Sequence, residues 1–306
     1  PRALAQAATR HAGRIAFWAT PWLPPIAVAA ADTLLWPLLF VLLAAPIWRV
    51  RQRLYRLVLP IVAAFALANI AYHVAVLAGD AAGGERALRA AVWTLVVLYT
   101  LKGGLLTPIF TGNALRALRR GDQARFVMPL EVAALALLIT LAAADLLAAP
   151  PFATGLLAAG CALVYGWRVA RWQGWRVADQ PLLPGMHLAF AWLVFAFGLK
   201  AVAELTGIIP EATWLHAFTV GALGLMMLAL MTRVSLRHTG RAIDVVPPAM
   251  RVAAGLMFAA AALRLAATVH GLPPAVVALA AALWSLAFAL YLWRFAAVLV
   301  APSLPR

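Results

Sequence analysis

The sequence predicts an all-α protein, a polytopic transmembrane helical bundle. Of its 306 residues, 65% are hydrophobic and only 11% are charged, and the mean hydropathy is +0.93. A soluble domain of this size needs far more polar surface than that. Apolar runs also recur along the chain at about 20 residues each, the length that crosses a hydrocarbon layer of roughly 30 Å. The lipid bilayer is therefore the first partner that the sequence implies.

Nine apolar runs are long enough to cross a bilayer as helices. They cover residues 25–48, 55–78, 88–111, 126–148, 152–170, 184–206, 213–235, 250–270 and 274–299. The opening segment, residues 2–20, contains Arg10, His11 and Arg14 and resembles a weaker tenth helix, which prolines at 21, 24 and 25 would end. We therefore expect residues 1–306 to form a single transmembrane domain of about nine to ten helices.

The loops between these spans alternate in charge. Arginines cluster after the first, third, fifth and seventh spans, whereas the intervening loops carry carboxylates or prolines. Short Arg-rich loops stay on the cytoplasmic side of a membrane, and here they would all lie on one side. The formal net charge of +15 is thus explained by membrane orientation, and nucleic acid is not an expected partner.

Several classes of site are excluded by composition. Cys161 is the only cysteine, so disulfides, Cys-rich zinc sites and iron–sulfur clusters cannot form within this chain. The sequence contains no phosphate-binding glycine loop ending in Lys-Ser/Thr and no dinucleotide fingerprint. Chemistry can therefore come only from histidines, charges within the spans and glycine or proline breaks.

The stretch 213–241 is the one around which we expect the other helices to pack. His216 begins its apolar span and His238 follows the end of it. At about 100° per residue, His216 shares a face with Val220, Leu223, Met227 and Val234. An adjacent stripe of small residues would admit another helix or a flat ligand at close range: Ala217, Gly221 and Gly224.

Four histidines are candidate ligands. His73 and His216 lie toward the outer ends of their spans, so they could face each other, whereas His187 and His238 lie near the inner side. Imidazole suits haem iron and copper, and apolar surroundings suit a porphyrin. The alternative is that each histidine is an interfacial or hydrogen-bonded helix residue.

Charged residues within the spans need partners. Lys200 and Glu204 are four residues apart, the spacing of a salt bridge on one helical face. Arg264 has no acidic residue in its own span, so Asp145 and Asp32 in other spans are its candidate partners. If haem is bound, Arg264 or Arg14 could instead hold a propionate.

The third span contains Gly103-Gly104 followed by Pro108. Because Pro108 has no N–H and presses on the carbonyl of Gly104, the helix should bend there. Helix packing explains this pattern, and so does a broken helix lining a cavity into which Lys102 points.

These motifs resemble those of the NnrS family of bacterial membrane proteins. The similarity is clearest in His216-Ala-Phe-Thr-Val-Gly-Ala-Leu-Gly and in Met231-Thr-Arg-Val-Ser-Leu-Arg-His238-Thr-Gly-Arg241. Gly103-Gly104, Pro108-Ile-Phe110-Thr111 and Leu292-Trp-Arg294-Phe resemble further family segments, although Leu105 stands where the family usually has arginine. The family has about twelve membrane helices, so the chain is expected to match its C-terminal three-quarters, without the N-terminal His-Glu-Met motif.

The resemblance implies a haem- and copper-containing protein of the bacterial inner membrane, linked to nitric oxide metabolism and nitrosative stress. Nitric oxide would be its small-molecule ligand, while its redox partner, and whether it is an enzyme, stay open. The family pattern carries over directly to His216 and His238, and His73 and His187 lie in similar segments. We expect His73 and His216 to bind the metal. The competing hypotheses are a secondary transporter of a small solute, favoured by the Gly-Gly…Pro segment, Lys102 and Arg264, and a purely structural subunit.

Overall fold

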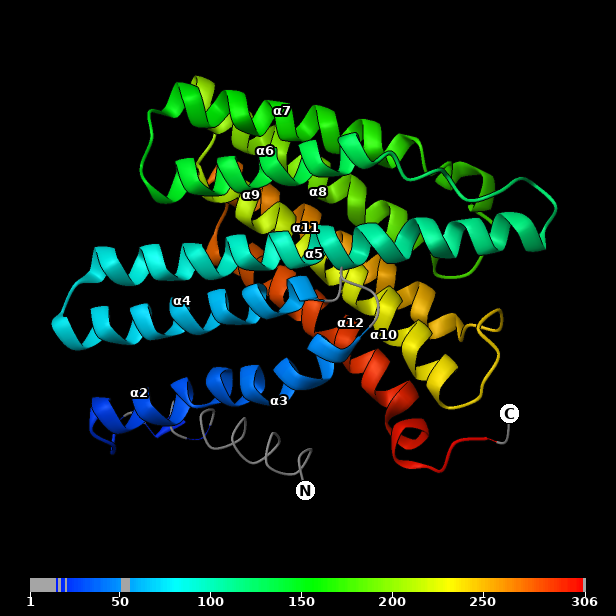
Figure 1. The fold of residues 1–306 in the computed structure, drawn as a ribbon, viewed down its shortest axis with the longest axis horizontal. Helices are drawn as coiled ribbons and strands as arrows, with labels where there is room; N and C mark the ends of the chain where they lie inside the picture. Colours follow the sequence, from blue (N-terminus) through cyan, green and yellow to red (C-terminus); the bar gives the residue numbers. More distant parts are fainter. Residues whose placement is uncertain (1–14, 16–17, 20, 51–55, 305–306) are drawn as a thin grey trace. The chain divides into compact units, whose positions relative to one another are not determined.

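The structure, a computed structural model, describes residues 15, 18–19, 21–50 and 56–304. Within these residues it contains helices and no strand, which confirms the all-α prediction. Nine helical spans in this part of the chain are long and apolar enough to cross a membrane, and they correspond to the nine expected runs (Figure 1). They are Pro25–Arg49, Val58–Ala78, Ala81–Ala117, Met128–Leu146, Pro151–Ala170, Leu183–Thr206, Ala212–His238, Pro248–His270 and Pro274–Val300.

Two spans differ from the expected ones. The first consists of two helices, α2 (Pro25–Thr33) and α3 (Leu35–Arg49), rather than one. The third, α5 (Ala81–Ala117), begins seven residues before the expected residue 88. Its early start is explained by Asp80, whose Oδ1 accepts a 2.8 Å hydrogen bond from the N–H of Gly83. An aspartate in this position satisfies one of the backbone donors that every helix start exposes. The predicted opening helix, residues 2–20, lies almost wholly outside the described residues.

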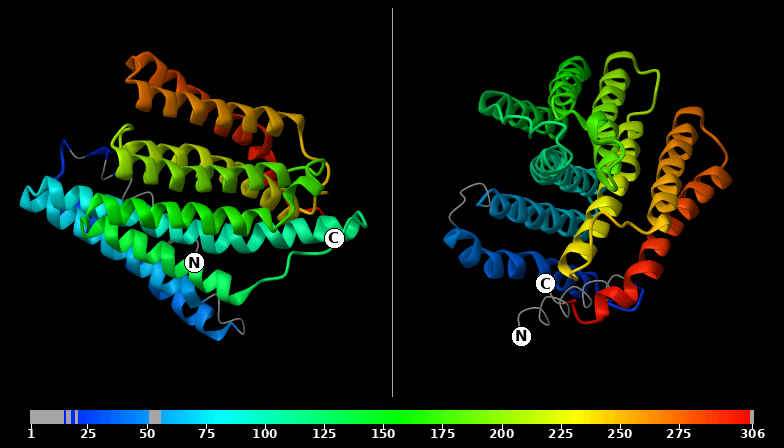
Figure 2. Two further views of the ribbon diagram at one scale, coloured as in Figure 1. Left: turned by 90° about the horizontal axis from the view of Figure 1, so that it is seen from above. Right: turned by 90° about the vertical axis from the view of Figure 1, so that its right-hand side faces the viewer.

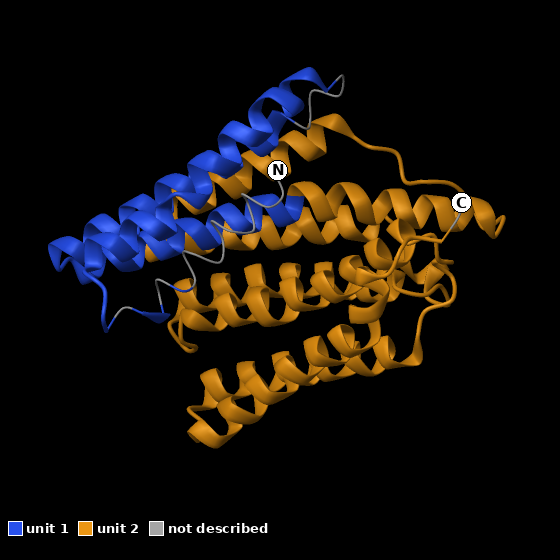
Figure 3. Ribbon diagram, turned by 90° about the horizontal axis from the view of Figure 1, so that it is seen from below, with its two compact units in different colours: residues 1–100 blue, residues 101–306 orange. Residues whose placement is uncertain are grey.

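The chain divides into two compact units, residues 1–100 and residues 101–306 (Figure 3). The first unit contains α2, α3, α4 (Val58–Ala78) and the first part of α5. In this unit α2 and α3 both pack on α4, and the rings of Trp36 and Phe65 stack with their centroids 4.9 Å apart.

The second unit contains the rest of α5 and the helices α6 (Met128–Leu146), α7 (Pro151–Ala170), α8 (Leu183–Thr206), α9 (Ala212–His216), α10 (Gly224–His238), α11 (Pro248–His270) and α12 (Pro274–Val300). Helix α8 packs against α7 on one side and against the α9–α10 span on another. Helices α11 and α12 form an antiparallel pair (Figure 2). Of the nine spans, Ala212–His238 has the largest buried share, 56%, so it lies at the centre of its unit, as the sequence predicts.

Candidate functional site

The segment directly after His216 is a π-helix. Helix α9 ends at His216, the π-helix η3 covers Ala217–Leu223, and α10 continues to His238. Thr219 supports the widened turn, because its hydroxyl donates a 2.7 Å hydrogen bond to the carbonyl of Leu215. π-Helical turns are rare and occur frequently at functional sites. A seven-residue π-helix beside a histidine therefore marks this segment as the candidate site.

The residues predicted to share a face with His216 are among the less buried residues of this span. His216, Val220 and Leu223 are half-buried, and Met227 and Val234 are 40% and 51% exposed. Residues between them are buried, among them Phe218, Leu225 and Leu236. The alignment was expected for an uninterrupted α-helix, and the π-helix Ala217–Leu223 changes the spacing, so the shared face stays a prediction.

The expected stripe of small residues is buried: Ala217, Gly221 and Gly224. A Cβ on Gly221 would lie 2.5 Å from the ring of Trp192 on α8, and one on Gly224 would lie 2.5 Å from the sulfur of Met257 on α11. Only glycine therefore permits these contacts, and η3 is held between α8 and α11 by them. The prediction that small residues admit close neighbours here is confirmed.

Substituting Gly221 by alanine should destabilise the protein more than substituting Gly224. The Trp192 ring is rigid, whereas the Met257 thioether can change rotamer to admit a methyl group. We expect Gly221→Ala to lower the free energy of unfolding by about 1–3 kcal/mol. Gly198→Ala is the control, because a Cβ there meets nothing within 4 Å. Thermal unfolding in detergent measures all three, and equal losses for Gly221→Ala and Gly198→Ala would contradict the packing argument.

His216 and Arg264 are brought together in the second unit. Helix α11, which carries Arg264, packs against both α9, which ends at His216, and η3. Arg264 also donates a 3.2 Å hydrogen bond to Thr268 in its own helix. Nearby, the indole Nε1 of Trp192 is buried and, among the described residues, has no hydrogen-bond partner. Such an orphaned donor beside η3 suits a ligand acceptor.

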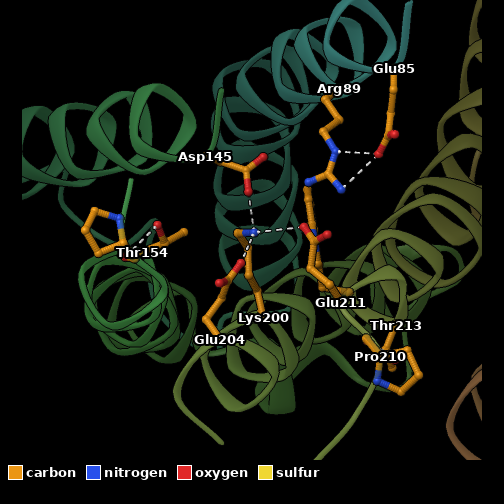
Figure 4. A network of polar contacts seen from close by, with 11 residues as sticks. Glu85, Arg89, Asp145, Thr154, Lys200, Glu204, Pro210, Glu211 and Thr213 are labelled. Atoms are coloured by element: carbon orange, nitrogen blue, oxygen red, sulfur yellow. Dashed lines mark hydrogen bonds and ion pairs between the residues drawn. The ribbon is translucent and has the colours of Figure 1, made fainter. Parts of the chain in front are cut away.

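The sequence made Asp145 a candidate partner of Arg264. In the structure Asp145 pairs with Lys200 instead. The ammonium of Lys200 is fully buried and lies 2.5 Å from Asp145, 3.0 Å from Glu204 and 3.3 Å from Glu211 (Figure 4). The Lys200–Glu204 pair is thus confirmed, as part of a larger cluster. Three carboxylates around one buried cation stabilise it far better than a single partner, which favours a structural role.

His73 lies in the first unit and has a carboxylate partner there. Its Nε2 is 3.1 Å from Oδ2 of Asp32 on α2, and Asn69 donates a 2.7 Å hydrogen bond to the same oxygen. His73 is 7% exposed. A carboxylate beside an imidazole fixes the tautomer and raises ligand basicity, the arrangement commonly found behind metal-bound histidines. His216 belongs to the other unit, so the binding of one ring by both histidines stays a prediction.

The remaining candidates have less distinctive surroundings. His187 is half-buried, its Nε2 lies 2.9 Å from the hydroxyl of Thr111, and its ring fills the space beside Gly174. These contacts match the hydrogen-bonded helix residue that the sequence left as an alternative. His238 ends α10, is exposed, and accepts a hydrogen bond at its backbone carbonyl from Ser303. Arg14 lies outside the described residues.

The Gly-Gly…Pro segment contains an interaction that the sequence did not predict. Pro108 cannot donate to the carbonyl of Gly104, and the guanidinium of Arg168 on α7 donates to that carbonyl instead, at 3.2 Å. Arg168 is 6% exposed and pairs with Glu131 on α6, with Nη2 and Nε 2.6 and 2.8 Å from the carboxylate. A Cβ on Gly104 would lie 2.5 Å from Arg168 Nη1, so only glycine admits this contact.

The Arg168–Glu131 pair and the π-helix of the second unit are not among the sequence-based predictions. Arg168 lies just before the end of the apolar run 152–170, and Glu131 lies inside the run 126–148. A charge within an apolar span is a signal that could have paired them. No comparable signal marks the π-helix, because small residues are compatible with either kind of turn.

Comparison with known proteins identifies the family. No curated protein and no solved structure matches the chain significantly. The family model described as NnrS protein matches residues 1–303, which is nearly the whole sequence. The match includes His216 with the π-helix after it, the His73–Asp32 pair, the Lys200 cluster and the Gly-Gly…Pro segment. The chain therefore belongs to the NnrS family.

Proposed function

We propose that this protein binds haem, and copper in addition, within the membrane and acts in the nitric oxide response. The observation that carries the proposal is the π-helix that starts directly after His216, with α11, the helix of Arg264, packed against it. Family membership supports a membrane protein related to nitric oxide. Nitric oxide is the proposed small-molecule ligand.

The donor groups around η3 fit a haem. The imidazole of His216 would hold the haem iron, and the Arg264 guanidinium would hold a propionate by a charge-assisted hydrogen bond. Trp192 and Phe258, whose ring centroids are 5.6 Å apart, supply aromatic surface near the glycine stripe. A bound haem iron with an open coordination position would supply the chemistry that binds nitric oxide. The chain itself would hold the ring and exclude water from it.

His73 is the proposed second metal ligand, with Asp32 orienting its imidazole. Imidazole also suits copper, so the same residue is where copper binding would be tested first. His187 and His238 are proposed only as groups at the edge of the cofactor site. We further propose that the protein lies in the bacterial inner membrane with its Arg-rich loops in the cytoplasm.

Absorption spectroscopy of the purified protein tests the ligand assignment. We expect a Soret band in membranes supplied with haem, and a loss of most of that band in His216→Ala because the axial bond is removed. His270→Ala is the matched control, since His270 is exposed at the end of α11. A band of unchanged position and intensity in His216→Ala would contradict the assignment. Elemental analysis measures copper in the unsubstituted protein and in His73→Ala. We expect less copper in the variant.

The transporter alternative has less support from the geometry. One of its arguments was a broken helix at the Gly-Gly…Pro segment, but α5 continues through this segment. Arg168 occupies the space beside Gly104 and satisfies the carbonyl that Pro108 leaves without a donor, so helix packing accounts for the segment. Solute flux into liposomes in the absence of haem would favour transport over the proposal.

A further inference from the structure

A surface cavity of about 420 Å³ lies at the end of α7, beside the loop that connects α5 to α6. Two arginines and two tryptophans line it: Arg125, Arg171, Trp167 and Trp175. Smaller side chains complete the lining. All of these belong to the second unit. The cavity lies among the Arg-rich loops, where a membrane helix meets the headgroup region.

The two cavity arginines are not neutralised by the acidic residues around them. Asp122 pairs with Arg116, Asp179 pairs with Arg120, and Glu131 pairs with Arg168. The hydrogen bond from Arg120 holds the pKa of Asp179 below its usual value, so this carboxylate stays charged toward Arg120. Among the described residues, no carboxylate lies within ion-pair distance of Arg125 or Arg171. The cavity therefore retains two positive charges.

The arginines are also held in place. Arg171 donates a 3.1 Å hydrogen bond to the backbone carbonyl of Arg125, which ties the end of α7 to the loop before α6. Guanidinium groups bind phosphate oxygens with a fixed fork of donors, so a pair of them forms a good phosphate site.

The two tryptophans give the cavity an amphipathic wall. Trp167 is 65% exposed and Trp175 is 68% exposed, so both rings are accessible at the cavity. At a membrane boundary, tryptophan rings lie at the headgroup level, with the apolar face toward acyl chains. A phosphate bound to the arginines would thus have its attached chains lying against apolar rings.

We propose that this cavity binds the headgroup of an anionic phospholipid, with its phosphate on Arg125 and Arg171 and its chains along Trp167 and Trp175. Free phosphate offers the same charge but no chains. The tryptophans favour the lipid as occupant. Basic pockets at the cytoplasmic ends of membrane helices are places where anionic headgroups bind.

The test measures lipid binding to the whole protein in detergent. Phosphatidylglycerol and phosphatidylcholine with brominated chains are titrated separately, and quenching of tryptophan fluorescence is recorded. We expect the anionic lipid to quench at lower concentration, and the double variant Arg125→Gln, Arg171→Gln to weaken its binding about 30-fold. The double variant Arg237→Gln, Arg251→Gln is the matched control, because it removes two exposed arginines of the same side that do not line the cavity.

Three results would overturn the proposal: equal binding of both lipids, equal losses in the two double variants, or displacement of the lipid by millimolar inorganic phosphate. If the cavity variant does not fold, Trp167→Phe with Trp175→Phe replaces it. Those substitutions should remove the part of the quenching by the brominated anionic lipid that exceeds the quenching by brominated phosphatidylcholine, while leaving the arginines intact. Quenching that persists in full would place the lipid elsewhere.

Discussion

Replacing Lys200 by methionine is expected to lower the free energy of unfolding by about 3–5 kcal/mol, because it removes the cation from a buried charge cluster. The ammonium is fully buried between Asp145, Glu204 and Glu211. Oxygen atoms of these three carboxylates lie within 4.8 Å of one another, so without the ammonium they repel one another at short range. Thermal or denaturant unfolding in detergent measures the loss.

The control for this variant is Arg251→Met, which also removes one positive charge from the second unit. Arg251 is exposed at the start of α11, so its replacement should change stability by no more than about 0.5 kcal/mol. A similar small effect for both substitutions would show that the cluster contributes little.

The membrane spans could be predicted from the sequence because their signal is local. Each apolar run must satisfy its own backbone hydrogen bonds in lipid, and a helix is the only single-segment solution. The limits of α5 were less accurate, because its start depends on a side chain outside the apolar run, Asp80, that accepts from Gly83. The break between α2 and α3 lies inside an apolar run, and its local signal is Pro37, which cannot donate to the carbonyl of Thr33, the last residue of α2.

The candidate site was predicted only in part, since its geometry depends on contacts between helices. His216 and the small residues after it are visible in the sequence, and so is Arg264 as a charge without a local partner. Their proximity depends on how α11 packs against η3, and the π-helix depends on the glycine contacts with Trp192 and Met257. The pairing of Lys200 with Asp145 crosses 55 positions, whereas the spacing rule for salt bridges extends over only about one helical turn.

Replacing Arg168 by methionine is the second change with a large expected effect, about 3–5 kcal/mol of unfolding free energy. Glu131 would lose its ion pair, and the carbonyl of Gly104 would lose its donor. The second loss has a specific remedy. Pro108 lies inside α5, four residues after Gly104, so an alanine at position 108 provides the N–H that an ordinary helix would direct at this carbonyl.

A double-mutant cycle separates the two losses. In the Arg168→Met background, Pro108→Ala should restore about 1–2 kcal/mol, because a buried carbonyl regains a partner. In the unsubstituted protein Pro108→Ala should raise the free energy of unfolding much less, since Arg168 already satisfies that carbonyl. Pro60→Ala is the control: Pro60 lies in the first turn of α4, where no intrahelical hydrogen bond is lost to proline, so it should not rescue Arg168→Met. Equal effects of Pro108→Ala in both backgrounds would show that Arg168 acts on Glu131 alone.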